Sequence, residues 1–123
     1  MIALVLAGPL VCAAADSVTI TGWLSDEACA TARAKSGTYT ATNPDCAQEC
    51  IRKGERMVLI AEREKAVYMI DNPEVARYHF AEHLRVSGTI DRTSNSLHVI
   101  SLQDLGDYQG PACARPKHNG SPK

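Results

Sequence analysis

The chain has 123 residues, which is the usual length of a single domain. Its 13 basic and 14 acidic side chains give a net charge of -1, which argues against strong nucleic-acid binding, since this requires a concentrated basic surface. Aromatic residues make up only 5% of the chain, which indicates a modest hydrophobic core.

The first 15 residues form an apolar segment that ends in Ala13-Ala14-Ala15, and no Lys or Arg precedes it. Such a segment is typical of a secretory signal peptide, and we expect cleavage before Asp16. The alternative is a buried N-terminal helix. The segment is shorter than the roughly 20 apolar residues that cross a bilayer, so the mature chain should carry no membrane span. The sequence therefore predicts a periplasmic or secreted protein.

Residues 17–24 alternate apolar and polar side chains and are rich in β-branched residues, which predicts the first strand. Gly22 inside it indicates a bulge or a bend. A short helical turn follows, which Ser25 or Asp26 can cap. Residues 31–43 are dominated by Thr, Ser and Asn and predict a long surface loop.

A cysteine-bearing helix is predicted next, over residues 44–53. Asn43 can cap it, a proline occupies its first position, and Gly54 ends it. Acidic side chains lie early and basic side chains late in this helix, which suits the helix dipole. Cys46 and Cys50 are one turn apart and therefore share a face.

The second half of the chain predicts four further strands and one short helix. Residues 71–73 start this helix, which we expect over residues 75–83 because Val75 and Tyr78 fall on one side. Residues 106–123 are rich in Pro and Gly and predict a disordered tail. The four strands are expected at residues 57–61, 66–70, 84–90 and 96–102.

The order of these elements matches the OB-fold, a small partly open five-stranded Greek-key barrel. The short helix lies between the third and fourth strands, and the cysteine-bearing helix lies in the long loop between the first and second. We therefore expect a mainly β domain over residues 16–105, followed by the tail over residues 106–123. The alternative is a flat α+β sheet built from the same strands.

Four segments together resemble a group of small exported bacterial proteins of uncharacterised function, regarded as OB-fold-like. These segments are residues 22–29 (GWLSDEAC), 46–54 (CAQECIRKG), 67–72 (VYMIDN) and 83–90 (HLRVSGTI). The resemblance covers residues 22–102. It implies export and a fold, and it does not imply an activity.

The cysteines predict disulfide bonds. Removal of the signal segment takes Cys12 away, and the even number that remains suits an oxidising compartment. We expect Cys29 to pair with Cys50 or Cys46, and the other of these two to pair with Cys113. The sequence alone leaves the pairing open. Such a bridge would pin the long loop to the rest of the domain.

Metal binding is an alternative role for Cys29, Cys46 and Cys50, whose thiolates can hold zinc or copper. The two-residue spacing of a zinc knuckle is absent. Thiol redox exchange is a further alternative, although thioredoxin-type sites also space their cysteines by two residues. A histidine would have to complete a metal site, and the candidates are His79, His83 and His98.

The sequence contains no recognised catalytic constellation, neither a nucleophile elbow nor a glycine-rich phosphate loop. His79 and His83 are one turn apart with Glu82 beside them, but the metalloprotease order His-Glu-x-x-His is missing. We expect a partly exposed helix end there. The adjacent carboxylates Asp26 and Glu27 are expected to serve in capping and solvation.

Three aromatic residues are candidates for a ligand-stacking platform, because OB-folds bind ligands on the face of their second and third strands. They are Trp23, Tyr39 and Tyr68. The alternative is that Trp23 and Tyr68 belong to the core and Tyr39 to the loop.

The sequence thus predicts a small exported domain without a catalytic role or a cofactor. We expect this domain to bind a ligand or to act as an accessory protein of the cell envelope, and we expect a disulfide bond to tether its long loop. We expect a monomer whose partner is a small ligand or an envelope protein. A metal-binding module and a thiol-active redox protein are the alternatives.

Overall fold

The computed structural model of the chain describes Gly8, residues 16–80 and residues 82–106. Of the predicted signal peptide, residues 1–15, only Gly8 is described, and of the predicted tail, residues 106–123, only Gly106 is described. Cys113 lies outside the described residues. The described part contains five strands, two α-helices and one 3-10 helix. The strands are β1 (Asp16–Asp26), β2 (Met57–Ala61), β3 (Ala66–Ile70), β4 (His83–Asp91) and β5 (Ser96–Asp104).

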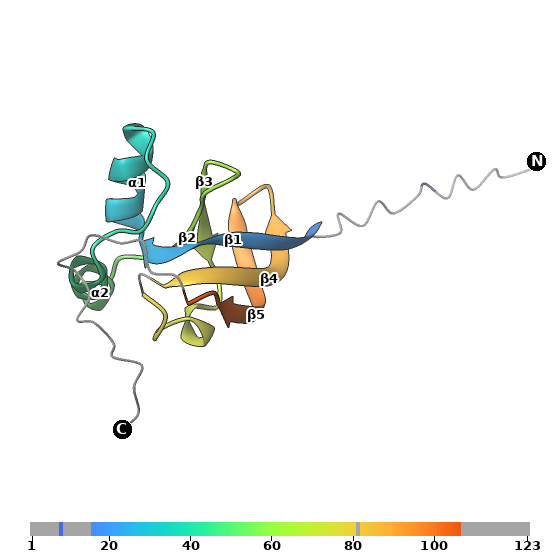
Figure 1. Cartoon of the computed structure of the whole chain (residues 1–123). Coiled ribbons are helices and arrows are strands. Elements are labelled where there is room, and N and C mark those ends of the chain that lie inside the picture. Colours follow the sequence, from blue (N-terminus) through green and yellow to red (C-terminus); the bar gives the residue numbers. More distant parts are fainter. Residues whose placement is uncertain (1–7, 9–15, 81, 107–123) are drawn as a thin grey trace, which may run out of the picture.

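The five strands close into a barrel in the order β1-β2-β3-β5-β4 (Figure 1). All neighbouring strands are antiparallel except β3 and β5, whose short parallel contact pairs Met69 with Ser96 and Ile70 with Leu97. The prediction of a mainly β fold is confirmed. The flat open sheet is wrong because each of the five strands pairs with two neighbours, which leaves no edge strand among them.

Two glycines allow the strands to approach each other closely enough for this closure. Gly22 lies where β1 pairs with Ala61 on one side and Leu84 on the other. A Cβ atom at Gly22 would lie 2.0 Å from the Ile60 carbonyl oxygen, and one at Gly88 would lie 2.0 Å from the His98 carbonyl oxygen. The β4–β5 register also shifts beside Gly88, which is a bulge of the kind that bends a strand.

Apolar side chains from all five strands fill the barrel, and a smaller cluster lies on its outer side. The outer cluster joins Val58 and Ile60 of β2 to Ala30 of the first helix, so both faces of β2 are buried. This explains the unbroken apolar run of that strand. Inside the barrel, the most completely buried large side chains are Leu24, Leu59, Leu84, Val86 and Leu97.

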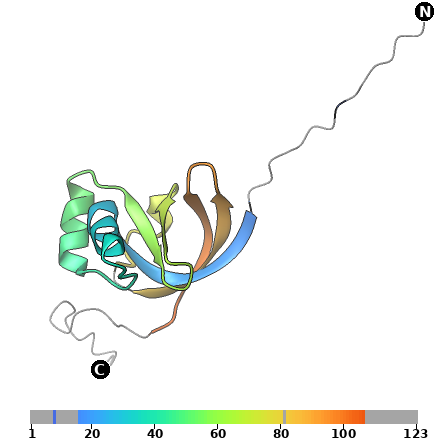
Figure 2. The same ribbon diagram turned by 90° about the horizontal axis from the view of Figure 1, so that it is seen from above.

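Both α-helices lie between β1 and β2 and sit side by side at one end of the barrel (Figures 1 and 2). They are α1 (Glu27–Lys35) and α2 (Pro44–Arg52). The Asn43 side chain accepts from the N–H groups of residues 45 and 46, which confirms the predicted cap of the cysteine-bearing helix. None of the helices in the described residues is long and apolar enough to cross a bilayer.

The predicted surface loop over residues 31–43 is wrong in two respects. Helix α1 continues as far as Lys35, and Ala41 and Thr42 are buried. The hydroxyl groups of Thr42 and Ser25 form a buried hydrogen bond, which holds the connection between the helices against the end of β1. Buried polar groups of this kind are ordinarily paired, and here each hydroxyl satisfies the other.

The predicted helix over residues 75–83 is also wrong. Only a 3-10 turn, η1 (Pro73–Val75), lies between β3 and β4, and His83 already belongs to β4. The side chain of Asn72 does not cap this turn but bonds to the backbone N–H and C=O of Val99. Tyr78 is 84% exposed, so the spacing that suggested a helix face buries nothing.

Candidate functional site

Two thiols and one carboxyl group meet where the helices join the barrel. The thiol groups of Cys29 and Cys50 lie 4.4 Å apart. A carboxylate oxygen of Asp26 joins them, and the ligand atoms of all three residues lie within 4.8 Å of one another. We call these three residues the thiol–carboxylate cluster.

Three elements build this cluster. Asp26 is the last residue of β1 and the N-cap of α1, so its Oδ2 accepts a hydrogen bond of 3.0 Å from the Cys29 N–H. This cap places a carboxylate beside the thiol in the first turn of the same helix. Cys50 comes from the last turn of α2 and is brought in by the packing of α2 beside the end of β1.

Asp26 differs from the solvated carboxylate that the sequence predicted. Its capping role is confirmed, but the side chain is completely buried. Among the described residues its Oδ1 atom has no hydrogen-bond partner. A buried carboxylate oxygen without a partner is costly, because it loses its hydration and gains nothing in exchange. One feature of the sequence indicated this arrangement. The side chain of an N-cap residue bonds to the backbone N–H three residues later, so Asp26 as a cap lies next to Cys29.

The cluster keeps its thiols protonated. Burial, followed by the hydrogen bond and charge of Asp26, raises the pKa of Cys29 from 9.0 to about 12. The pKa of Cys50 is also raised, first by burial and then by the charge of Asp26. Since the thiolate is the nucleophile in disulfide exchange, the reduced pair is a poor attacking group at neutral pH.

The other two disulfide candidates do not join the cluster. Cys46 is exposed, one turn before Cys50 on α2. Cys113 lies outside the described residues. Of the sequence's metal candidates, the structure therefore brings Cys29 and Cys50 together, and it places Asp26 with them where we expected Cys46.

The three aromatic candidates are distributed as the core alternative expects. Trp23 is completely buried, and its ring stacks on His83 with a centroid separation of 4.4 Å. Tyr68 is buried in the barrel, and the half-buried Tyr39 packs against the outer cluster. Since stacking of a ligand needs an exposed ring face, Trp23 and Tyr68 do not offer a platform in this structure.

His79 and His98 have local partners. The Nδ1 atom of His79 lies 2.6 Å from a Glu82 oxygen, and that of His98 lies 2.7 Å from an Asp71 oxygen. No histidine in the described part of the chain belongs to the thiol–carboxylate cluster. They therefore do not complete the metal site that we expected from the cysteines.

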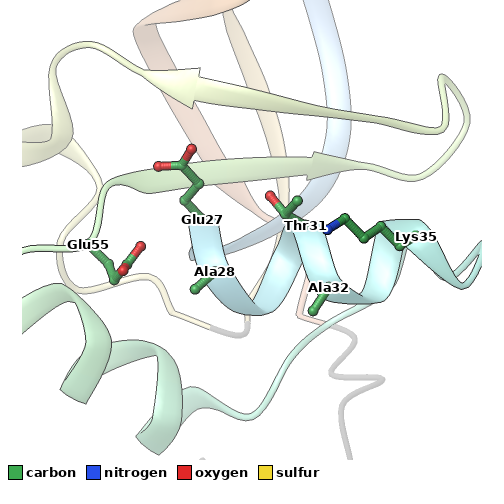
Figure 3. A pocket seen from close by; sticks show the side chains of 6 residues that line it. All are labelled: Glu27, Ala28, Thr31, Ala32, Lys35 and Glu55. Carbon is green, nitrogen blue, oxygen red and sulfur yellow. The ribbon is translucent and has the colours of Figure 1, made fainter.

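Two surface hollows lie near the helices. The polar one, of about 410 Å³, follows α1 and ends at Glu55 (Figure 3). Its Glu27 carboxylate is held by a bidentate contact with the Arg56 guanidinium at 2.8 and 2.9 Å. We interpret it as a solvated helix face, because its other lining residues are Ala28, Thr31, Ala32 and Lys35.

The second hollow is more apolar and measures about 350 Å³. It lies between α2 and the segment after η1, where Ile51, Met57 and Phe80 form its apolar lining. Tyr78 and Arg77 stand at the same site, with the guanidinium carbon 5.9 Å from the ring centroid. Among the described residues, no carboxylate forms an ion pair with Arg77. We call this feature the apolar hollow.

Comparisons of the whole chain with protein-family models, with curated proteins and with solved structures find no match.

Proposed function

We propose that this chain is a small exported, non-catalytic binding domain of the OB-fold kind, with its helical insertion tied down by a disulfide bond. The strand order β1-β2-β3-β5-β4 supports the OB-fold assignment, as does the parallel contact between β3 and β5. The two helices between β1 and β2 are then an insertion in the first loop of that fold. Cleavage of a signal peptide before Asp16 would leave all of β1 in the mature chain.

The observation that carries the proposal is the position of Cys29 and Cys50 on two different helices with their thiols 4.4 Å apart. The two sulfurs would have to approach each other by more than about 2 Å to reach the disulfide bond length of about 2.05 Å. The bridge would close the loop of residues 29–50, for which the chain-entropy estimate is about 3 kcal/mol. It would join the two helices to each other. Cys46 would then remain for Cys113.

The apolar hollow is our candidate for the binding site. Its volume of about 350 Å³ falls within the range of small-molecule pockets. Apolar side chains line it, and Arg77 adds a cation that no described carboxylate pairs with. These features favour a small apolar ligand that carries one anionic group. An aromatic or aliphatic carboxylate has this chemistry.

The first experiment is mass spectrometry of the full-length product expressed with its own N-terminal segment. The proposal predicts a mature form that begins at Asp16, found outside the cytoplasm. It also predicts that Cys29 and Cys50 of the denatured protein resist alkylation until a reductant is added. Retention of the N-terminal segment would contradict export. Free alkylation of both cysteines without a reductant would contradict the disulfide tether.

The second experiment tests the hollow by ligand-induced thermal stabilisation with a panel of small aromatic and aliphatic carboxylates. We expect a carboxylate from the panel to raise the melting temperature of the wild type. Arg77→Ala should remove that rise. Arg85→Ala, on the exposed side of β4, is the matched control and should keep it. Equal responses of the two variants would contradict this location.

A further inference from the structure

We propose that the reduced thiol–carboxylate cluster is a site for Zn²⁺, with Cys29, Cys50 and Asp26 as its three protein ligands. This inference concerns Cys29 and Cys50 in their reduced state, whereas the proposed function rests on the disulfide bond that they form when oxidised. The two states exclude each other, because a disulfide has no thiolate to offer a metal.

The geometry fits a zinc ion after a small contraction. Zinc–sulfur bonds of about 2.3 Å in a tetrahedral arrangement place two sulfurs about 3.8 Å apart. The thiols of Cys29 and Cys50 lie 4.4 Å apart, and the carboxylate oxygen of Asp26 lies within 4.8 Å of both sulfurs. The two sulfurs therefore need to approach each other by about 0.6 Å. A zinc–oxygen bond of about 2.0 Å places the carboxylate oxygen about 3.5 Å from each sulfur, so this oxygen needs to approach them by at most about 1.3 Å.

The buried carboxyl group of Asp26 is a second and independent observation. Its side chain is completely buried, and its Oδ1 atom has no hydrogen-bond partner among the described residues. A disulfide between Cys29 and Cys50 would supply no donor to this oxygen. A cation bound between the three side chains would compensate its charge, which is the usual way that proteins accommodate buried carboxylates.

The ligand set selects the class of metal. Two thiolates and one carboxylate suit a borderline ion such as Zn²⁺ better than Mg²⁺ or Ca²⁺, which prefer oxygen ligands alone. Three protein ligands leave the fourth tetrahedral position for water. Binding replaces the two S–H bonds by two S–Zn bonds and releases two protons to solvent, so the step needs no oxidant or reductant.

The test is a Co²⁺ titration of the full chain, reduced with a phosphine and freed of metal. Thiolate–cobalt charge-transfer absorption should appear, saturate at one ion per chain and disappear when Zn²⁺ is added. Calorimetry in two buffers with different ionisation enthalpies should show the release of roughly two protons per bound Zn²⁺. Absence of the charge-transfer absorption in the reduced wild type would overturn the inference.

Three variants locate the site. Asp26→Asn keeps a good helix cap and should weaken Zn²⁺ binding at least tenfold. Cys50→Ser should abolish the charge-transfer absorption. Cys46→Ser, one turn away on the same helix, is the matched control and should bind as the wild type does. Unchanged affinity in Asp26→Asn would overturn the inference, and so would equal losses in the two cysteine variants.

The outcomes also separate this inference from the proposed function. If oxidation links Cys29 to Cys50 but the reduced chain binds no Co²⁺, only the zinc site fails. If the reduced chain binds Co²⁺ but Cys29 and Cys50 stay unlinked after oxidation, only the disulfide tether fails.

Discussion

Replacement of Gly22 by alanine tests the closure of the barrel. The new Cβ atom would lie 2.0 Å from the Ile60 carbonyl oxygen, whereas ordinary van der Waals contacts of a Cβ atom begin at 3.4 Å. Strands β1 and β2 would therefore have to separate by more than 1 Å at a position where β1 also pairs with β4. Overpacking costs about 1–3 kcal/mol, and the loss of a ladder hydrogen bond adds about 1 kcal/mol. We expect a total loss of about 3 kcal/mol.

Urea denaturation followed by circular dichroism measures this loss, and the melting temperature should fall by about 15 °C. Gly37→Ala is the matched control. Nothing lies within 4 Å of a Cβ atom at Gly37, and only its positive φ of 78° opposes the change. That penalty is about 1 kcal/mol. If Gly22→Ala destabilises the protein no more than Gly37→Ala does, β1 does not approach β2 as closely as a closed barrel requires.

Three further predictions concern single residues. Asn72→Ala removes two hydrogen bonds to the Val99 backbone, of 2.7 and 2.9 Å, and should lower the free energy of unfolding by about 2 kcal/mol in urea; a loss under 0.5 kcal/mol would refute this. Trp23 is the single tryptophan and is completely buried, so its fluorescence should be blue-shifted and resist acrylamide; a solvent-exposed spectrum would contradict the burial of this side chain. In the reduced protein, the raised pKa of Cys29, about 12 instead of 9.0, should make its alkylation slow at pH 8, and Asp26→Asn should accelerate it; an unchanged rate would show that the carboxylate does not act on this thiol.

The same raised pKa fixes the pH dependence of the reduced protein. Below pH 9 the Cys29 thiol is protonated in both the folded and the unfolded chain, so it adds no pH dependence. Above pH 9 the unfolded chain loses the thiol proton first. The free energy of unfolding should therefore fall as the pH rises from 9 towards 12.

The strands of this protein follow from local patterns. The alternation in β1 and the short apolar runs of β2 and β3 marked all three within a few residues, because a half-buried or fully buried strand leaves a clear trace in the sequence. The cap of α2 was equally readable, since Asn43 and the following proline act within one turn.

The segment between β3 and β4 shows why other parts could not be predicted. A proline after Asn72 looks like the start of a helix, and the spacing of Val75 and Tyr78 looks like a helix face. Neither side chain has a surface to pack on, since they are 43% and 84% exposed. Asn72 instead bonds to Val99 on a strand that is distant in sequence. Tertiary contacts, and not the local helix signals, therefore determine the conformation of this segment.

The candidate site was predictable only in part. The sequence indicated Cys29 and Cys50 as partners, but it left Cys46 as an equal alternative because the two cysteines of α2 share a face. The packing of α2 beside the end of β1 decides between them. The burial of Asp26 depends on the same packing, which local sequence does not reveal. The sequence therefore indicated Asp26 only as a capping residue.

The most direct test of the account is disulfide mapping, by peptide mass spectrometry without reduction, of the full-length chain expressed with its own N-terminal segment. The account predicts a cross-linked peptide pair that joins Cys29 to Cys50. A link from Cys29 to Cys46 would contradict it, because Cys46 is exposed and lies outside the thiol–carboxylate cluster.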